Sequence, residues 1–139
     1  MTRQALTETA IRRLSKPGRF ISHQDEYIVW VLAPFLETTD PNLQYYYDYT
    51  QSIAEYQKVF DEIGCIWKWV NVTVPEIETV VGGISGASGT KIPVVINLCD
   101  GDETNGIPGV SVIAALEKHN LIYTGSNDHF YRITTSKIP

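Results

Sequence analysis

Cysteine and basic residues are both scarce in this sequence. Only 2 cysteines occur among 139 residues, Cys65 and Cys99, and their separation fits no metal-ligand motif. Both lie in apolar, strand-like runs, so we expect two buried free thiols in a reducing compartment. The net charge of −5 leaves no excess of basic side chains, which argues against a nucleic-acid-binding surface.

A long apolar run is missing as well. The longest, at residues 27–35, falls far short of the roughly 20 residues that a membrane-spanning helix needs. Residues 1–20 are basic but contain no continuous apolar stretch like that of a secretory signal. A basic, acid-poor start is also found in organelle-targeting segments, although an amphipathic helix is the simpler interpretation. We expect a cytoplasmic protein with no membrane contact, whose residues 1–25 form an N-terminal extension.

Motifs for metal or nucleotide chemistry are not found. The 3 histidines have no mutual spacing typical of a zinc site or a catalytic triad. The glycine-rich stretch 82–89 is followed by Thr90 and Lys91, the reverse of the Gly-Lys-Ser/Thr order in a phosphate-binding loop. The segment 75–91 is therefore expected to be a mobile connection or a poorly formed helix.

The sequence does contain an alternation of strand and helix patterns. Apolar runs typical of buried parallel strands occur at residues 27–32, 66–74, 92–98 and 121–123. Helices are predicted at residues 49–63, 110–119 and 126–137, the first ending at Gly64 and the last beginning at Ser126 or Asn127. Because parallel strands need crossover connections, this order predicts an α/β domain at residues 26–139. We expect a Rossmann-like parallel sheet of about four strands with helices on both faces.

Polar residues gather where three of these strands end, at residues 33–37, 97–103 and 123–127. Ligands of such sheets bind beyond the carboxyl ends of the strands. Asp100, Asp102 and Glu103 would suit a metal ion or a cationic substrate group. They are equally typical of a turn that precedes a helix.

Four tyrosines stand almost side by side, and they cannot all face one core across a helix: Tyr45, Tyr46, Tyr47 and Tyr49. Some of these rings must therefore meet solvent, a partner subunit or another domain.

The second half of the chain resembles a known family. Residues 95–101 read Val-Ile-Asn-Leu-Cys-Asp-Gly, residues 106–109 read Gly-Ile-Pro-Gly, and residues 121–126 read Leu-Ile-Tyr-Thr-Gly-Ser. In this order they resemble the N-terminal, pre-ATP-grasp domain of D-alanine–D-alanine ligases. The spacing from Ser126 to Lys137 matches the spacing to the nucleotide-binding lysine of that family. Two features depart from its pattern: Asp100 stands in place of a histidine, and the first strand does not lead into Gly-Gly-x-Ser-x-Glu.

The resemblance implies the substrate-side domain of an ATP-dependent carboxylate–amine ligase. Its substrate would be an amino acid or a peptide, and the departures leave an amino acid other than D-alanine open. Glu37 is the only acid near the family's position for the glutamate that meets the substrate amino group. The helix after Gly109 would offer its positive N-terminus to an anionic group. The residues implied for substrate binding are Glu37, Asn97, Asp100, Gly101 and Glu103, with Lys137 for ATP.

The resemblance also implies ATP and Mg²⁺ as cofactors of a longer protein. In ATP-grasp enzymes both are held by a central and a C-terminal domain, and the sequence ends at Pro139, where a central domain would begin. We therefore expect the chain alone to be inactive, to bind neither cofactor tightly, and to contain no metal site and no catalytic residue. Related ligases dimerise through this domain, so a homodimer is expected. The alternative is a stand-alone, non-catalytic α/β domain that binds a small ligand or a protein partner.

Overall fold

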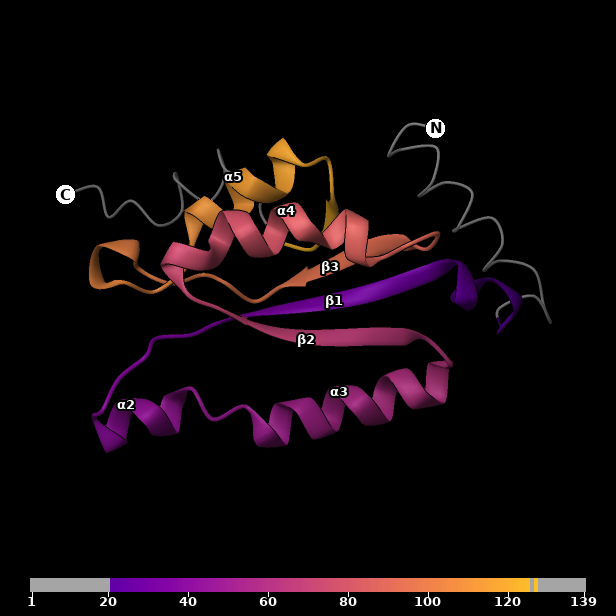
Figure 1. Cartoon of the computed structure of the whole chain (residues 1–139). Coiled ribbons are helices and arrows are strands. Elements are labelled where there is room, and N and C mark those ends of the chain that lie inside the picture. The colour runs from indigo at the N-terminus through magenta and orange to yellow at the C-terminus, as the bar shows by residue number, and fades with distance from the viewer. Residues whose placement is uncertain (1–20, 126, 128–139) are drawn as a thin grey trace.

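A parallel sheet in the order β2-β1-β3-β4 lies at the centre of the computed structural model, which describes residues 21–125 and residue 127. Its strands are β1 (Tyr27–Pro34), β2 (Ile66–Val72), β3 (Ile92–Asn97) and β4 (Ile122–Tyr123). Each predicted strand is present, with bounds shifted by at most two residues at either end. The α/β class with a four-stranded parallel sheet is confirmed (Figure 1).

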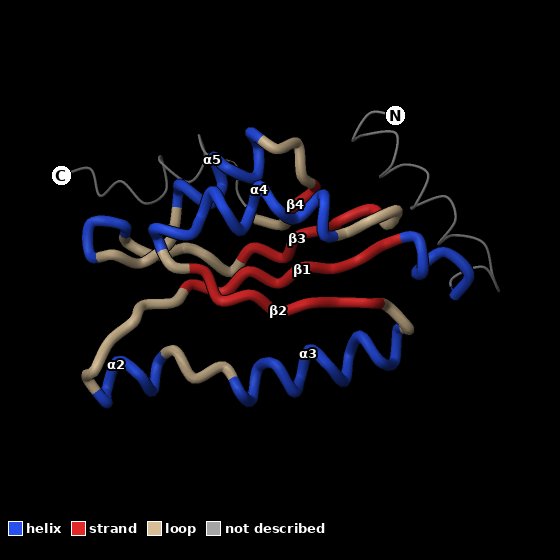
Figure 2. The backbone as a smooth tube through the Cα atoms, in the orientation of Figure 1, coloured by secondary structure: helices blue, strands red, loops and turns tan. Residues whose placement is uncertain are grey.

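Helices cover the sheet on both faces, as Figures 1 and 2 show. One face carries α3 (Thr50–Ile63), which follows the short α2 (Pro41–Tyr46), and the other carries α4 (Ile77–Ala87) and α5 (Val110–Lys118). Three short 3-10 helices complete the described part: η1 (Ile21–Glu26), η2 (Val74–Glu76) and η3 (Glu103–Asn105). Gly64 ends α3 in the left-handed conformation, with φ of 77°, as predicted. The helix predicted at residues 126–137 lies outside the described residues, except for Asn127.

The main core lies between the sheet and the α4–α5 pair. Ile28, Trp30 and Leu32 alternate along β1 toward this face and pack with the buried stripes of α4 and α5. The indole Nε1 of Trp30 donates a hydrogen bond of 3.0 Å to Ser88 Oγ, just after α4. The buried polar end of the tryptophan is thereby satisfied, and β1 is joined to the end of α4.

Aromatic side chains fill the space between α3 and β2 on the opposite face. The rings of Tyr56 and Phe60 lie 6.1 Å and 5.4 Å from the ring of Trp67. Tyr56 also meets Trp69 edge to face at 5.6 Å. These contacts explain why the apolar stripe of α3 and the alternating tryptophans of β2 occur together in the sequence.

Of the two alternatives for residues 75–91, the mobile connection is wrong and a helix is present, because the eleven-residue α4 lies there after η2. Ile77, Val81 and Ile84 recur at intervals of four and three residues, and all three are buried. Burying three such side chains outweighs the glycine cost of about 1 kcal/mol per residue in a helix. No phosphate-binding loop exists in this stretch.

The expected environment of the cysteines is correct for one of the two. Both are free thiols, and Cys99 is buried, with 2% of its surface exposed. Cys65 is only half-buried, because it occupies the turn between α3 and β2 and not a strand.

Candidate functional site

The strand order places a topological switch point between β1 and β3. The chain leaves β1 toward α3 on one face, and it leaves β3 toward α5 on the other (Figure 1). The two exits lie side by side, since the N–H of Leu98 donates to the carbonyl of Leu32 at 2.9 Å. Open α/β sheets bind ligands in crevices at such strand ends.

A hollow of ≈340 Å³ lies at this edge, and we name it the strand-end pocket. Its walls come from three segments: residues 35–37 after β1, residues 73–76 after β2, and Gly106 in the β3–α5 loop. The volume is at the lower end of the range for small-molecule sites. Gly106 has φ of 83°, so the loop turns tightly here against Leu36.

Two acidic residues line the strand-end pocket, Glu37 and Glu76, and none of its lining residues is basic. The hydroxyl of Thr73 donates to Glu76 Oε2 at 2.9 Å, which orients that carboxylate. The remaining walls are largely apolar and come from Phe35, Leu36, Val74 and Pro75. Such a site attracts a small cation that carries an apolar body.

Two of the four tyrosines support the wall after β1. The ring of Tyr47 packs edge to face on Phe35 at 5.9 Å, and the hydroxyl of Tyr49 donates to the carbonyl of Pro34 at 2.5 Å. Burial, with smaller contributions from the nearby Tyr47, Cys99 and Asp100, raises the pKa of Tyr49 to about 12. Tyr49 is therefore a neutral donor at physiological pH, and its hydrogen bond holds the end of β1 in place.

Asn97 and Asp100 shape the exit of β3 and do not line the pocket. Asn97 Oδ1 accepts a hydrogen bond from the N–H of Cys99 at 3.0 Å, while the N–H of Asn97 donates to Thr124 Oγ1 at 3.1 Å. Burial, with added repulsion from Asp100 and Glu103, raises the pKa of Cys99 to about 12. Cys99 is therefore a protonated thiol and not a nucleophile.

Glu103 occupies the N-terminus of α5. Its carboxylate accepts hydrogen bonds from the N–H of Gly109 at 3.2 Å, the N–H of Ser111 at 3.2 Å and Ser111 Oγ at 2.7 Å. The expectation that this helix end would be open to an anionic ligand is corrected, since an internal carboxylate already binds there. Asp102 likewise forms a turn, accepting from the N–H of Thr104 at 3.0 Å. The turn-forming interpretation therefore describes both acids.

Removal of the Glu103 carboxylate is expected to destabilise the domain. Glu103→Ala should lower the free energy of unfolding by about 1–2 kcal/mol, the effect of losing a charged cap at a helix N-terminus. Glu103→Gln keeps an acceptor oxygen, so it should lower the free energy of unfolding by less than Glu103→Ala does. Urea unfolding measures both changes, and Glu55→Ala in the exposed middle of α3 serves as the matched control. A Glu103→Ala variant as stable as this control would contradict the capping role.

Gly101 is required by the backbone of the same loop. Its N–H donates to the carbonyl of Pro108 at 2.8 Å, and a Cβ at this position would lie 2.1 Å from Ile107 Cγ2. Of the five residues predicted to bind substrate, only Glu37 lines the strand-end pocket. Glu76 and Thr73 were not predicted. Both could have been found from the sequence, because they lie at the end of the predicted strand at residues 66–74 or just after it. Only the ends of the other three strands were considered as ligand-binding positions.

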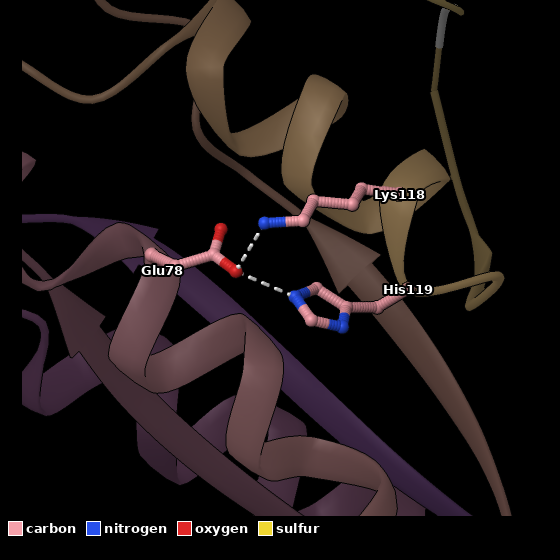
Figure 3. A network of polar contacts seen from close by, with 3 residues as sticks. All are labelled: Glu78, Lys118 and His119. Carbon is pink, nitrogen blue, oxygen red and sulfur yellow. Dashed lines mark hydrogen bonds and ion pairs between the residues drawn. The ribbon is translucent and has the colours of Figure 1, made fainter.

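A second hollow of ≈360 Å³ lies between α4 and α5. On its rim Glu78 Oε1 contacts Lys118 Nζ at 2.9 Å and His119 Nε2 at 2.8 Å (Figure 3). These partners, Lys118 first, hold the pKa of Glu78 below its usual value. His119, which follows α5, thus joins the end of α5 to α4.

The described residues do not fit the cofactors that the family resemblance implies. Within residues 21–125 and 127, no group of three or more His, Cys, Asp or Glu side chains could hold a metal ion. The glycine-rich stretch 82–89 lies mostly within α4, so it forms no phosphate cradle. Lys137, predicted to contact ATP, lies outside the described residues. In the same part of the chain, no helix is both long and apolar enough to cross a membrane.

The strand-end pocket is the candidate site, because it lies at the carboxyl ends of β1 and β2 and combines two acidic residues with an apolar wall. The α4–α5 hollow is a weaker candidate, since its acid, Glu78, already contacts Lys118 and His119. Comparison of the chain with protein-family models, with curated proteins and with solved structures gave no match.

Proposed function

We propose that this chain is the substrate-side domain of a cytoplasmic, ATP-dependent carboxylate–amine ligase, and that it binds the amine substrate in the strand-end pocket. The observation that carries the proposal is the position of Glu37 in a small, acidic, partly apolar pocket at the carboxyl ends of parallel strands. The resemblance of residues 95–126 to the pre-ATP-grasp domain of D-alanine–D-alanine ligases supports the reaction class.

The role of this domain in such a ligase is to bind and orient the amine. The carboxylate of Glu37 attracts an ammonium group, and no basic lining residue competes for it. Phe35 and Leu36 offer apolar contact to the carbon skeleton of the substrate. ATP and Mg²⁺ would be held by other parts of the protein, with Lys137 as the predicted contact of this chain to ATP.

Binding of simple amines tests the proposal. Glycine, L-alanine and D-alanine are titrated into the ¹⁵N-labelled chain, with lactate as the analogue in which a hydroxyl replaces the amine. We expect the amino acids, but not lactate, to shift the amide resonances of residues 35–37 and 73–76. Glu37→Gln should weaken amine binding about tenfold, the lower end for a hydrogen bond to a charged group.

Glu78→Gln is the matched control for this experiment, because Glu78 lines the neighbouring hollow and is paired with Lys118 and His119. It should bind amines as the unmodified chain does. The proposal is wrong if no amine shifts these resonances, or if Glu37→Gln binds amines with unchanged affinity.

A second candidate function is a stand-alone domain that binds a protein partner, which includes a second copy of the chain. The observation that favours it is α2, where Tyr45 and Tyr46 are 81% and 74% exposed and no residue is buried. Exposed tyrosines of this kind are typical of interfaces. The same titration separates the two candidates, since a domain that binds only a protein partner gives no amine-dependent shifts around the strand-end pocket.

A further inference from the structure

The strand-end pocket contains one more carboxylate than a single ammonium group requires. From its two acids and its apolar wall we infer that the amine substrate is a dication, such as a diamine or a basic amino acid, with one ammonium at Glu37 and the other at Glu76. This inference rests on the proposed function and specifies the substrate class of the same pocket.

Glu76 is held in position for this role. It ends η2, where its N–H donates to the carbonyl of Thr73 at 3.0 Å while its own Oε2 accepts from the Thr73 hydroxyl at 2.9 Å. This reciprocal pair fixes the backbone and the carboxylate together. Because its side chain is already ordered, Glu76 would lose less side-chain entropy on binding a ligand than a free glutamate would.

The charge of the pocket is not balanced by the protein. Two residues further along the chain, Glu78 forms an ion pair with Lys118 and also contacts His119. Within the described part of the chain, neither Glu37 nor Glu76 forms an ion pair. Two acidic residues without a basic partner therefore line one hollow, and a ligand with two positive charges supplies a partner for each.

The apolar wall selects an organic dication over a metal ion. Phe35, Leu36, Val74 and Pro75 supply hydrocarbon to the pocket. A hard divalent cation needs six or more oxygen ligands, and hydrocarbon provides none. An alkyl chain with an ammonium at each end matches both the walls and the acids, and the volume of ≈340 Å³ accommodates one such molecule.

Matched pairs of probes test the inference by calorimetry or by amide shifts on the whole chain. L-Lysine is compared with L-norleucine, and 1,4-diaminobutane with butylamine, so that each pair differs by the second amine. We expect each dication to bind about fivefold to tenfold more tightly than its monoamine, as for a partly exposed charged contact. Added salt should reduce this ratio.

Variants then assign the second ammonium site. Glu76→Gln should weaken binding of the dication more than binding of the monoamine, so that the ratio of the two affinities falls to about one, whereas Glu76→Asp and Glu78→Gln should retain the preference for the dication. Urea unfolding establishes that each variant is folded before it is titrated.

The outcomes distinguish this inference from the proposed function. Binding of L-norleucine that depends on Glu37, with L-lysine no tighter, overturns the inference and leaves the proposed function standing. The inference is also overturned if Glu76→Gln weakens the binding of L-lysine and of L-norleucine equally. Glu76 would then act only by holding the turn at residues 73–76. No binding of any amine overturns both.

Discussion

Substitution of Gly101 by alanine is expected to lower the free energy of unfolding by about 3 kcal/mol, the upper range for overpacking. The new Cβ would lie 2.1 Å from Ile107 Cγ2, 2.6 Å from Ile107 Cβ and 2.8 Å from the Ile107 carbonyl oxygen. Rotation of the isoleucine side chain cannot relieve contacts with its own Cβ and backbone. Ile107 leads directly into the buried Pro108, so the loop cannot shift without disturbing the start of α5.

Urea unfolding of Gly101→Ala measures this effect, and the chain contains two glycines that serve as matched controls. Gly83 and Gly86 lie in α4, and a Cβ at either position would meet no atom within 4 Å. Alanine at these sites should raise stability by about 0.5–1 kcal/mol, because it restricts the unfolded chain and favours the helix. The expectation is wrong if Gly101→Ala lowers the free energy of unfolding by less than the amount by which the control substitutions raise it. The loop would then adapt freely to the added methyl group.

Truncation of Leu32 to alanine is expected to cost about 2–5 kcal/mol of unfolding free energy. Leu32 has 0% of its surface exposed and lies in β1, the strand with neighbours on both sides. Its side chain packs with the buried stripes of α4 and α5, so the substitution leaves a cavity where the elements meet. The same strand leads to Glu37, so local loosening would also reach the strand-end pocket.

The control for Leu32→Ala is Leu43→Ala on α2. Leu43 is 37% exposed, and α2 has no buried residue, so this change should alter stability by no more than about 0.5 kcal/mol. Urea midpoints and slopes of both variants are compared. Equal midpoints would mean that the core between β1 and the α4–α5 pair is not the main source of stability.

The strands were predictable because their apolar runs are continuous. Residues 27–32 and 92–98 contain hardly a polar side chain, and such a run is stable only where both faces are covered. The α3 helix was predictable for a similar reason, since Tyr56 and Phe60 belong to a clear stripe and Gly64 marks its end. The α4 helix was not, because its glycines have low helix propensity and its three buried residues gain their stability only from β1 and α5.

The candidate site was predictable only in part. Glu37 follows a recognisable strand, so its place at a strand end is a local inference. The acids after β3 were grouped with it, but Asp102 and Glu103 satisfy backbone N–H groups nearby, an outcome that depends on how the loop folds onto α5. Glu76 meets the same pocket because β2 pairs with β1, a contact between residues far apart in the chain.

Local patterns alone therefore determined the α/β class, the positions of four strands and the positions of α3 and α5. The reason is that the buried face of a helix or strand requires apolar residues at a regular spacing, which is visible in the sequence. The order β2-β1-β3-β4 was decided only by the tertiary structure, because strand pairing joins residues that no local pattern relates. That order determines which loops meet. It brought Glu76 and Glu37 to the same pocket, whereas Glu103 caps the N-terminus of α5.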